Sequence, residues 1–241
     1  MILGLGRYGG AIYKTLAWCG QMPGYELQIH GYDTSLEAVS KFRASCPALF
    51  QQYPNMTTQA LTFGGEEFVA AFSNFDAPTL VICCLGDDQR NAEAEQTVKM
   101  LCARNGWDTD ILILGNRTEM YRYAALTDNS GYAIHQAWVE TQGENPVVAQ
   151  ELYNKNEYNY WSTRASAIWQ KHRRRLGIAD DAPETEVAEH ERWMAYMLSQ
   201  GFVYGSVKDL FMAKTHPSIT DFNNLSDAEK AKDGLMARAG T

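Results

Sequence analysis

The sequence lacks several features that would each assign the chain to a class of protein. No apolar run approaches the ~18–20 residues that a membrane-spanning helix needs, so we expect these 241 residues to be soluble as they stand. Gly4 interrupts the opening apolar run and no small-residue cleavage site follows, which argues against a secretory signal peptide. The 21 basic side chains are outnumbered by 29 acidic ones. The net charge of −8 argues against nucleic acid as a partner and leaves room only for a local basic patch at His172–Arg175.

Cysteine is scarce, and its spacing indicates neither disulfides nor a metal site. None of the five cysteines forms a Cys-x-x-Cys pair or stands at ligand spacing from a histidine. Cys83 and Cys84 are adjacent in a predicted buried strand, where successive side chains point to opposite faces. We interpret the cysteines as reduced core residues of a cytoplasmic protein and expect no bound metal.

What the sequence does contain is a first half in which short apolar runs alternate with helix-like segments. The expected strands are Met1–Leu3, Leu27–Tyr32, Leu61–Phe63, Thr79–Leu85 and Asp110–Leu114. The expected helices between them are Ala11–Cys19, Ser35–Ser45, Glu66–Phe72 and Ala92–Asn105. The run Thr79–Leu85 is apolar throughout, which is typical of a strand covered on both faces. The alternation predicts an α/β fold with a Rossmann-like, doubly wound parallel sheet.

The second half has a different pattern, in which helices dominate. The expected helices are Val147–Tyr153, Ser162–Leu176, Glu184–Gln200 and Ser226–Arg238. We therefore predict a nucleotide-binding domain over residues 1–145, a helical linker over 146–180 and a small, mostly helical domain over 181–241. Because only three residues precede the first glycine turn, we also expect the chain to be a piece of a longer protein.

A glycine motif stands between the first strand and the first helix. Gly4, Gly6 and Gly9 match the spacing G-x-G-x-x-G, with Arg7 and Tyr8 between them. In this motif the first glycine permits a tight turn, the second lets the backbone approach a pyrophosphate, and the third allows close helix packing. Asp33 ends the second strand, where a carboxylate can accept hydrogen bonds from ribose and repel a 2′-phosphate.

The glycine motif and Asp33 predict NAD or another adenine nucleotide as cofactor, in preference to NADP. Further polar residues follow the later strands: Gly86, Asp87, Asp88 and Asn116. Ligands bind at this edge of open α/β sheets, so we include them in the candidate site. Two alternatives stay open. The glycine turn can belong to a fold that has lost its ligand, and the polar residues can cap helices or stand in ordinary loops.

The first half resembles the NAD-binding TrkA-N (RCK) domains that regulate potassium channels and transporters. The resemblance is carried by GLGRYG at residues 4–9, by Asp33 and by VICCLGDDQRN at 81–91, and it covers about positions 1–120. It implies that a nucleotide is bound without being consumed, and that the chain signals by changing shape or assembly as a homo-oligomer.

Residues 184–233 carry a second, more specific pattern. Its segments are Glu189–Trp193, Gly201–Gly205, Lys214–Pro217 and Phe222–Lys230. In this order they resemble the RyR domain, a repeat first described in ryanodine receptors and also found in bacterial proteins. We expect a compact helical unit held together by the aromatic side chains Trp193, Phe202, Tyr204 and Phe222. The functional alternative is an aromatic-lined ligand pocket formed by Arg192, Trp193, Tyr204, Lys214 and His216.

No catalytic motif accompanies these patterns. Tyr121, Tyr123 and His135 could carry protons, but none stands in a recognisable arrangement such as Tyr-x-x-x-Lys. We therefore expect a non-enzymatic, nucleotide-binding sensor. By resemblance it would be the cytoplasmic regulatory portion of a larger bacterial protein, such as a potassium-channel-like or transport protein with a membrane domain in the same chain. The alternative is a small NAD-dependent oxidoreductase.

Overall fold

A computed structural model describes residues 1–75, 77–114, 131–141, 157–182 and 184–239, together with residues 143, 151 and 153. It divides the chain into two compact units. The first comprises Met1–Thr15 and Gln28–Asn116, and the second comprises Leu16–Leu27 and Arg117–Thr241. The expected helix Val147–Tyr153 falls almost entirely outside the described residues, as do Tyr121 and Tyr123.

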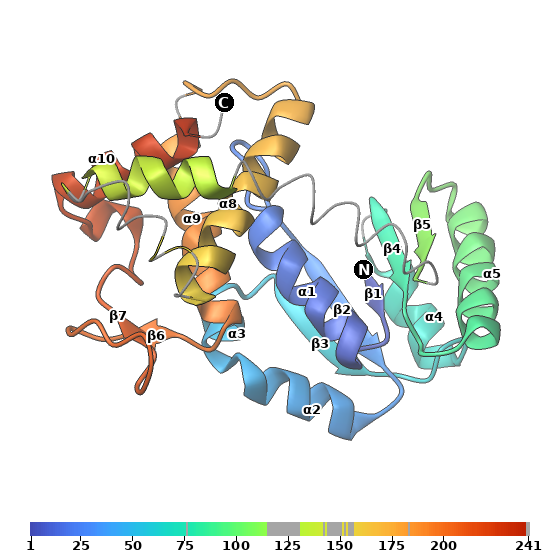
Figure 1. Cartoon of the computed structure of the whole chain (residues 1–241). Helices are drawn as coiled ribbons and strands as arrows, with labels where there is room; N and C mark the ends of the chain where they lie inside the picture. Colours follow the sequence, from blue (N-terminus) through green and yellow to red (C-terminus); the bar gives the residue numbers. More distant parts are fainter. Residues whose placement is uncertain are drawn as a thin grey trace. The chain divides into compact units, whose positions relative to one another are not determined.

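The first unit contains a five-stranded sheet, which confirms the α/β class (Figure 1). The strands are β1 (Ile2–Leu3), β2 (Ile29–Asp33), β3 (Met56–Ala60), β4 (Leu80–Cys83) and β5 (Asp110–Ile113). Their order is β3-β2-β1-β4-β5, and every neighbouring pair is parallel. This order is compatible with a Rossmann-like, doubly wound fold. The strand predicted at Leu61–Phe63 is wrong. The third strand, β3, lies just before these residues at the edge of the sheet, and its alternating exposed residues leave no continuous apolar run in the sequence.

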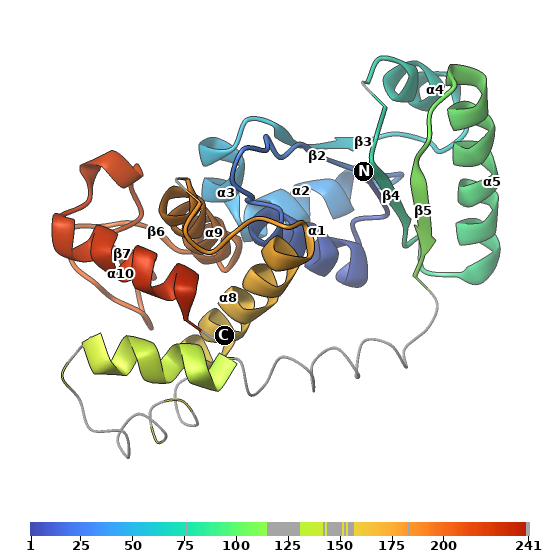
Figure 2. The ribbon, with the colours of Figure 1, turned by 90° about the horizontal axis from the view of Figure 1, so that it is seen from above.

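Helices cover both faces of this sheet (Figures 1 and 2). Helices α1 (Arg7–Cys19), α2 (Leu36–Ser45) and α3 (Pro47–Gln52) lie on one side, where Tyr13 packs edge-on against Phe42 at 5.1 Å. Helices α4 (Glu66–Ser73) and α5 (Asp88–Asn105) lie on the other side. There Phe68 and Phe72 of α4 pack with Leu3 and with the apolar face of α5. Burial from both sides explains the continuous apolar sequence of β4.

The second unit is mostly helical. Its named elements are α8 (Glu157–Arg175), α9 (Thr185–Ser199), β6 (Val203–Tyr204), β7 (Thr215–His216), the 3-10 helix η1 (Phe222–Asn224) and α10 (Asp227–Arg238), and residues 131–141 are also helical. Helix α9 is central and buried over most of its surface. Within the described ranges, no helix combines the length and the apolar character that crossing a membrane requires.

Helix α8 differs from the linker expected over 146–180. Its Trp169 and Arg173 are fully buried, and Arg173 donates to the backbone oxygen of Ala237 at 2.9 Å. Its basic residues lie mainly in its last turn, and its side chains Ala165, Ala167 and Trp169 are buried. The stretch behaves as a packed core helix.

The boundary between the units also differs from the expected position after residue 145. The helix over 131–141 belongs to the second unit, where Tyr132 and His135 contact Tyr153. Residues Leu16–Leu27 belong to the second unit as well, since the Trp169 indole N–H donates to the backbone oxygen of Gln21 at 2.6 Å. Contacts between residues far apart in sequence, which composition does not reveal, set this division.

Candidate functional site

The glycine loop follows β1 and leads into α1, at the carboxyl edge of the sheet. Strand β1 lies between β2 and β4, and the helices that follow β1 and β4 cover opposite faces. This is the switch point of a doubly wound sheet, where a crevice forms for ligands. Backbone bonds fix the loop there: the Gly4 N–H donates to the oxygen of Tyr32 at 2.7 Å, and the Cys84 N–H donates to the oxygen of Leu3 at 2.8 Å.

The three motif glycines are not equivalent. Gly4 has a left-handed φ of +99°, and a Cβ there would lie 2.4 Å from the Cys84 oxygen. A Cβ on Gly9 would lie 1.7 Å from the Gly4 oxygen. Backbone conformation and close packing therefore require glycine at positions 4 and 9. A Cβ on Gly6 would meet no described residue within 4 Å, and the φ of Gly6 is not left-handed, so nothing in the described part of the chain requires glycine there.

Asp33 already has partners in this structure. Its Oδ2 accepts from the Leu5 N–H at 2.7 Å, inside the glycine loop, and its Oδ1 accepts from the Ser35 N–H at 2.8 Å. The carboxylate thus ties the loop to the end of β2. Each oxygen keeps a second lone pair, so the ribose role stays a prediction.

The other residues expected to contact the nucleotide lie in different surroundings. Arg7 and Tyr8 are exposed on the first turn of α1, and Tyr8 is 48% exposed. Gly86 has a left-handed φ of +93°, which explains a glycine there without any ligand. Asp87 accepts from the Arg90 N–H at 2.7 Å and caps α5, and Asp88 is the first residue of that helix. Capping, the alternative reading of Asp87, is thus observed. Asn116 lies outside the described residues.

Sequence reasoning assigned no role to Asn91, which holds the loop between β4 and α5. Its side chain is 2% exposed, and its Oδ1 accepts from the Leu85 N–H at 2.7 Å. A buried amide that satisfies a loop N–H fixes the backbone beside the glycine loop. An asparagine three residues into a helix gives no sequence signal for this role.

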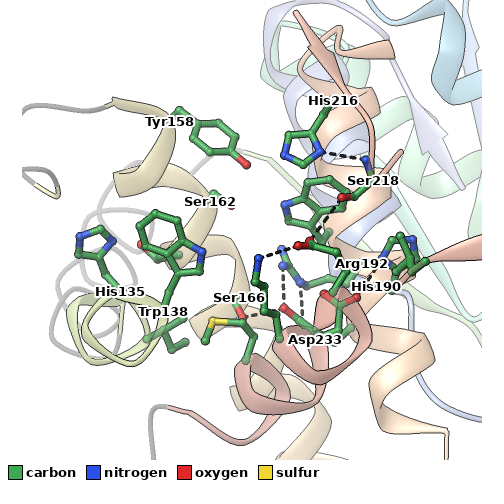
Figure 3. Close-up of a pocket in the computed structure, with 18 of the residues that line it drawn as sticks. His135, Trp138, Tyr158, Ser162, Ser166, His190, Arg192, His216, Ser218 and Asp233 are labelled. Atoms are coloured by element: carbon green, nitrogen blue, oxygen red, sulfur yellow. Dashed lines mark hydrogen bonds and ion pairs between the residues drawn. The ribbon is translucent and has the colours of Figure 1, made fainter. Parts of the chain in front are cut away.

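The second unit contains a cavity of about 290 Å³ (Figure 3). Helix 131–141 and α8 supply Trp138, Tyr158 and Ser166 among others, and the rest of the lining comes from α9, from α10 and from the residues between β6 and α10, which include Lys208 and His216. In Figure 3, Trp138 and Tyr158 stand across from Arg192 and His216. Segments distant in sequence thus close around one space.

The structure brings together three of the five residues expected in this pocket. Arg192, Trp193 and His216 line the cavity, whereas Tyr204 and Lys214 do not. Tyr204 is 62% exposed, so its expected place in the core is wrong: it stands on the short strand β6, whose two residues both face solvent. Trp193 is only partly buried because one side of its ring borders the cavity. Phe202 is buried as expected.

A buried ion pair forms the floor of the cavity. Glu189 and Arg192, three residues apart on α9, are both 2% exposed. Arg192 Nε donates to Glu189 Oε2 at 2.9 Å and Nη2 donates to Oε1 at 2.8 Å, while the Ser166 hydroxyl also donates to Oε1 at 3.2 Å. Burial raises the pKa of the Glu189 carboxyl, and Arg192 acts in the opposite direction. This two-point contact is the geometry in which a carboxylate stays ionised when buried.

Two of the histidines that line the cavity, His190 and His216, have pKa values shifted in opposite directions. Burial lowers the pKa of His190, but its contacts with Asp233 at 3.1 Å and with the Thr220 oxygen at 2.8 Å outweigh burial and raise that pKa overall. Both ring nitrogens therefore face acceptors. For His216, burial together with Lys208 and Lys232 lowers the pKa to about 4, against the weaker effect of Glu229. His216 is accordingly neutral, and its Nδ1 accepts from the Ser218 N–H at 3.1 Å.

Several lining residues were missed by sequence reasoning, namely Trp138, Tyr158, Ser166, Lys208, Glu229, Lys232 and Asp233. The first three precede the RyR-like segment, and no spacing relates them to it. Comparison of the chain with protein-family models, with curated proteins and with solved structures found no match. The resemblances to the TrkA-N and RyR families therefore stay predictions.

Proposed function

We propose that this chain is a nucleotide-binding regulatory protein that holds NAD or another adenine nucleotide at the glycine loop and does not consume it. The observation that carries the proposal is Gly6. Neither φ nor packing requires a glycine there, yet it stands at the switch point of the sheet. A pyrophosphate resting on the backbone would occupy the open space beside it.

The surrounding chemistry fits such a ligand. The first N–H groups of α1 have no acceptor within the helix, and the helix dipole favours an anion at this end. Asp33 stands at the end of β2, beside the loop. Its negative charge would repel a 2′-phosphate, which favours NAD over NADP.

A regulatory role accounts for the sequence better than an oxidoreductase does. Of the expected proton carriers, His135 is buried and lines the cavity of the second unit. By resemblance to TrkA-N and RyR domains, we further propose that the chain is the cytoplasmic, self-associating part of a larger bacterial protein. A potassium-channel-like or transport protein with its own membrane domain is the best candidate.

Two measurements test the nucleotide site. Mass spectrometry of the denatured protein identifies any nucleotide that co-purifies. Calorimetry with NAD, NADP, ATP, ADP and AMP then compares the wild type with Gly6→Val and with Ala11→Val, a control that adds the same methyl groups at an exposed position of α1. We expect Gly6→Val to fold and to bind at least about tenfold more weakly, a loss of about 1.4 kcal/mol.

Equal affinity in the wild type and Gly6→Val would place the nucleotide elsewhere. A change in absorbance at 340 nm with a candidate substrate would instead support the oxidoreductase alternative. Sedimentation of the nucleotide-bound protein as a monomer of 27.1 kDa at high concentration would contradict self-association.

A further inference from the structure

Arg192, which lines the cavity of the second unit, has a buried hydrogen-bond donor without an acceptor among the described residues. Two nitrogens of the Arg192 guanidinium are used by Glu189, but among the described residues Nη1 has no partner. An arginine side chain stays protonated in proteins, so this donor cannot be removed by titration. An unsatisfied buried donor is costly, and it is a common feature of sites that complete their hydrogen bonds with a ligand. The missing acceptor points to a ligand oxygen.

The walls of the same cavity are aromatic. Trp193, Trp138, Tyr158 and His216 all line it. The Trp193 ring is held in place from two sides, by an edge contact with His216 at 4.9 Å and by a hydrogen bond with the Tyr158 side chain. Figure 3 shows the rings of Trp138, Tyr158 and His216 grouped around the open space. Fixed, partly exposed rings offer a stacking surface for a planar group.

The charges that face the cavity come from three carboxylates, three permanently cationic side chains and His190, so they leave one surplus positive charge when His190 is protonated. Each lining carboxylate has a cationic partner: Glu189 has Arg192, Glu229 has Lys232 at 2.6 Å, and Asp233 has His190 at 3.1 Å. Lys208 lines the cavity with an exposed side chain and has no hydrogen-bond or ion-pair partner among the described residues. Its effect on His216 shows that its charge is felt inside the cavity. The surplus favours an anion.

We propose that this cavity binds a small molecule that consists of a planar aromatic ring bearing a carboxylate or a phosphate monoester. An oxygen of the anion accepts from Arg192 Nη1, Lys208 supplies the balancing charge, and the ring lies against Trp193. The volume of about 290 Å³ stands at the small end of the range for ligand sites, about 300–1,000 Å³. It therefore suits a ligand of one or two rings. This site is separate from the glycine loop, so the proposal of a ligand here does not depend on the proposed nucleotide.

The test compares matched ring compounds on the full chain. Fluorine NMR follows 4-(trifluoromethyl)benzoate and its neutral isostere 4-(trifluoromethyl)benzamide, and unlabelled phenyl phosphate, benzoate and inorganic phosphate serve as competitors. We expect the carboxylate to bind about tenfold more tightly than the amide, because only the anion uses the surplus charge. Stronger competition by phenyl phosphate than by benzoate assigns the natural anion as a phosphate monoester, and the reverse assigns it as a carboxylate.

The variants avoid the buried ion pair, whose loss could unfold the unit. Lys208→Met is expected to weaken benzoate binding about threefold to tenfold, and Trp193→Leu about tenfold. Lys214→Met is the matched control, a lysine of the same segment that does not line the cavity. Gly6→Val controls for binding at the glycine loop. Equal binding of acid and amide, equal losses in Lys208→Met and Lys214→Met, or no binding of either probe to the folded chain would overturn the proposal.

Discussion

His216 should make the stability of the second unit fall in mild acid. The ring is 9% exposed, and its Nδ1 accepts the Ser218 N–H, so protonation would remove a hydrogen bond and place a charge in the cavity wall. Burial, Lys208 and Lys232 hold its pKa at about 4, compared with 6.5 ordinarily. The folded pKa lies below the unfolded one. The stabilising contribution is therefore complete above pH 6.5 and is lost as the pH falls through the folded pKa.

The size of the effect follows from the same two values. The interval from 6.5 to about 4 corresponds to about 3 kcal/mol, at about 1.4 kcal/mol for each pH unit. Urea unfolding, monitored by tryptophan fluorescence between about pH 7 and about pH 4, should show that the wild type loses this amount of unfolding free energy relative to His216→Gln. The subtraction removes the titration of carboxyl groups, which both proteins share. An NMR titration of Lys208→Met should show a higher pKa for His216 than in the wild type. Parallel stability curves for the wild type and His216→Gln would refute the reasoning.

Three further predictions concern other parts of the chain. The pKa of His190 is raised, so the contribution of this histidine to the free energy of unfolding should be complete below its ordinary pKa of 6.5 and be lost as the pH rises through the folded pKa. The melting temperature of the wild type should show this fall, and that of His190→Gln should not. Trp169→Ala should cost about 3–5 kcal/mol, because it empties a fully buried site of α8. Urea midpoints will check this against Trp161→Ala, a control at a position that is 50% exposed. Gly9→Ala should lower the melting temperature of the first unit strongly and Gly6→Ala only slightly, since only the former Cβ meets backbone; equal effects would show that the loop repacks freely.

Local signals in the sequence predicted much of the fold. The apolar run at Thr79–Leu85 contains β4, and the glycine motif follows β1 and runs into the first turn of α1. The helix expected from Ser226 is also present, because the Ser226 hydroxyl caps α10 by accepting from the Glu229 N–H at 3.3 Å. Each of these features depends on neighbours a few residues away. β3 was misplaced because an edge strand with one exposed face has no apolar run.

Local signals in the sequence predicted only part of the candidate site of the second unit. Glu189 and Arg192 stand three residues apart on α9, a spacing that brings side chains together on one helix face, and they form an ion pair. No spacing relates either residue to Trp138 or Tyr158, which complete the cavity from helices at least 31 residues earlier in the chain. Such a wall depends on tertiary packing alone. The exposure of Tyr204 has the same origin, since an aromatic residue in a short strand is buried only if another element covers it.

Each unit consists of two separate stretches of the chain, so no single cut in the gene separates one complete unit from the other. A gene segment that begins at Arg117 would encode most of the second unit but omit Leu16–Leu27. The fragment would then lack the Gln21 carbonyl that accepts the Trp169 indole N–H, and the Trp18 ring that contacts Tyr196. A fragment that ends at Asn116 would carry Trp18 away from the residues that bury it. A gene fusion or transfer that moved either unit alone would therefore need a compensating change at the cut, so the two units are expected to be inherited together.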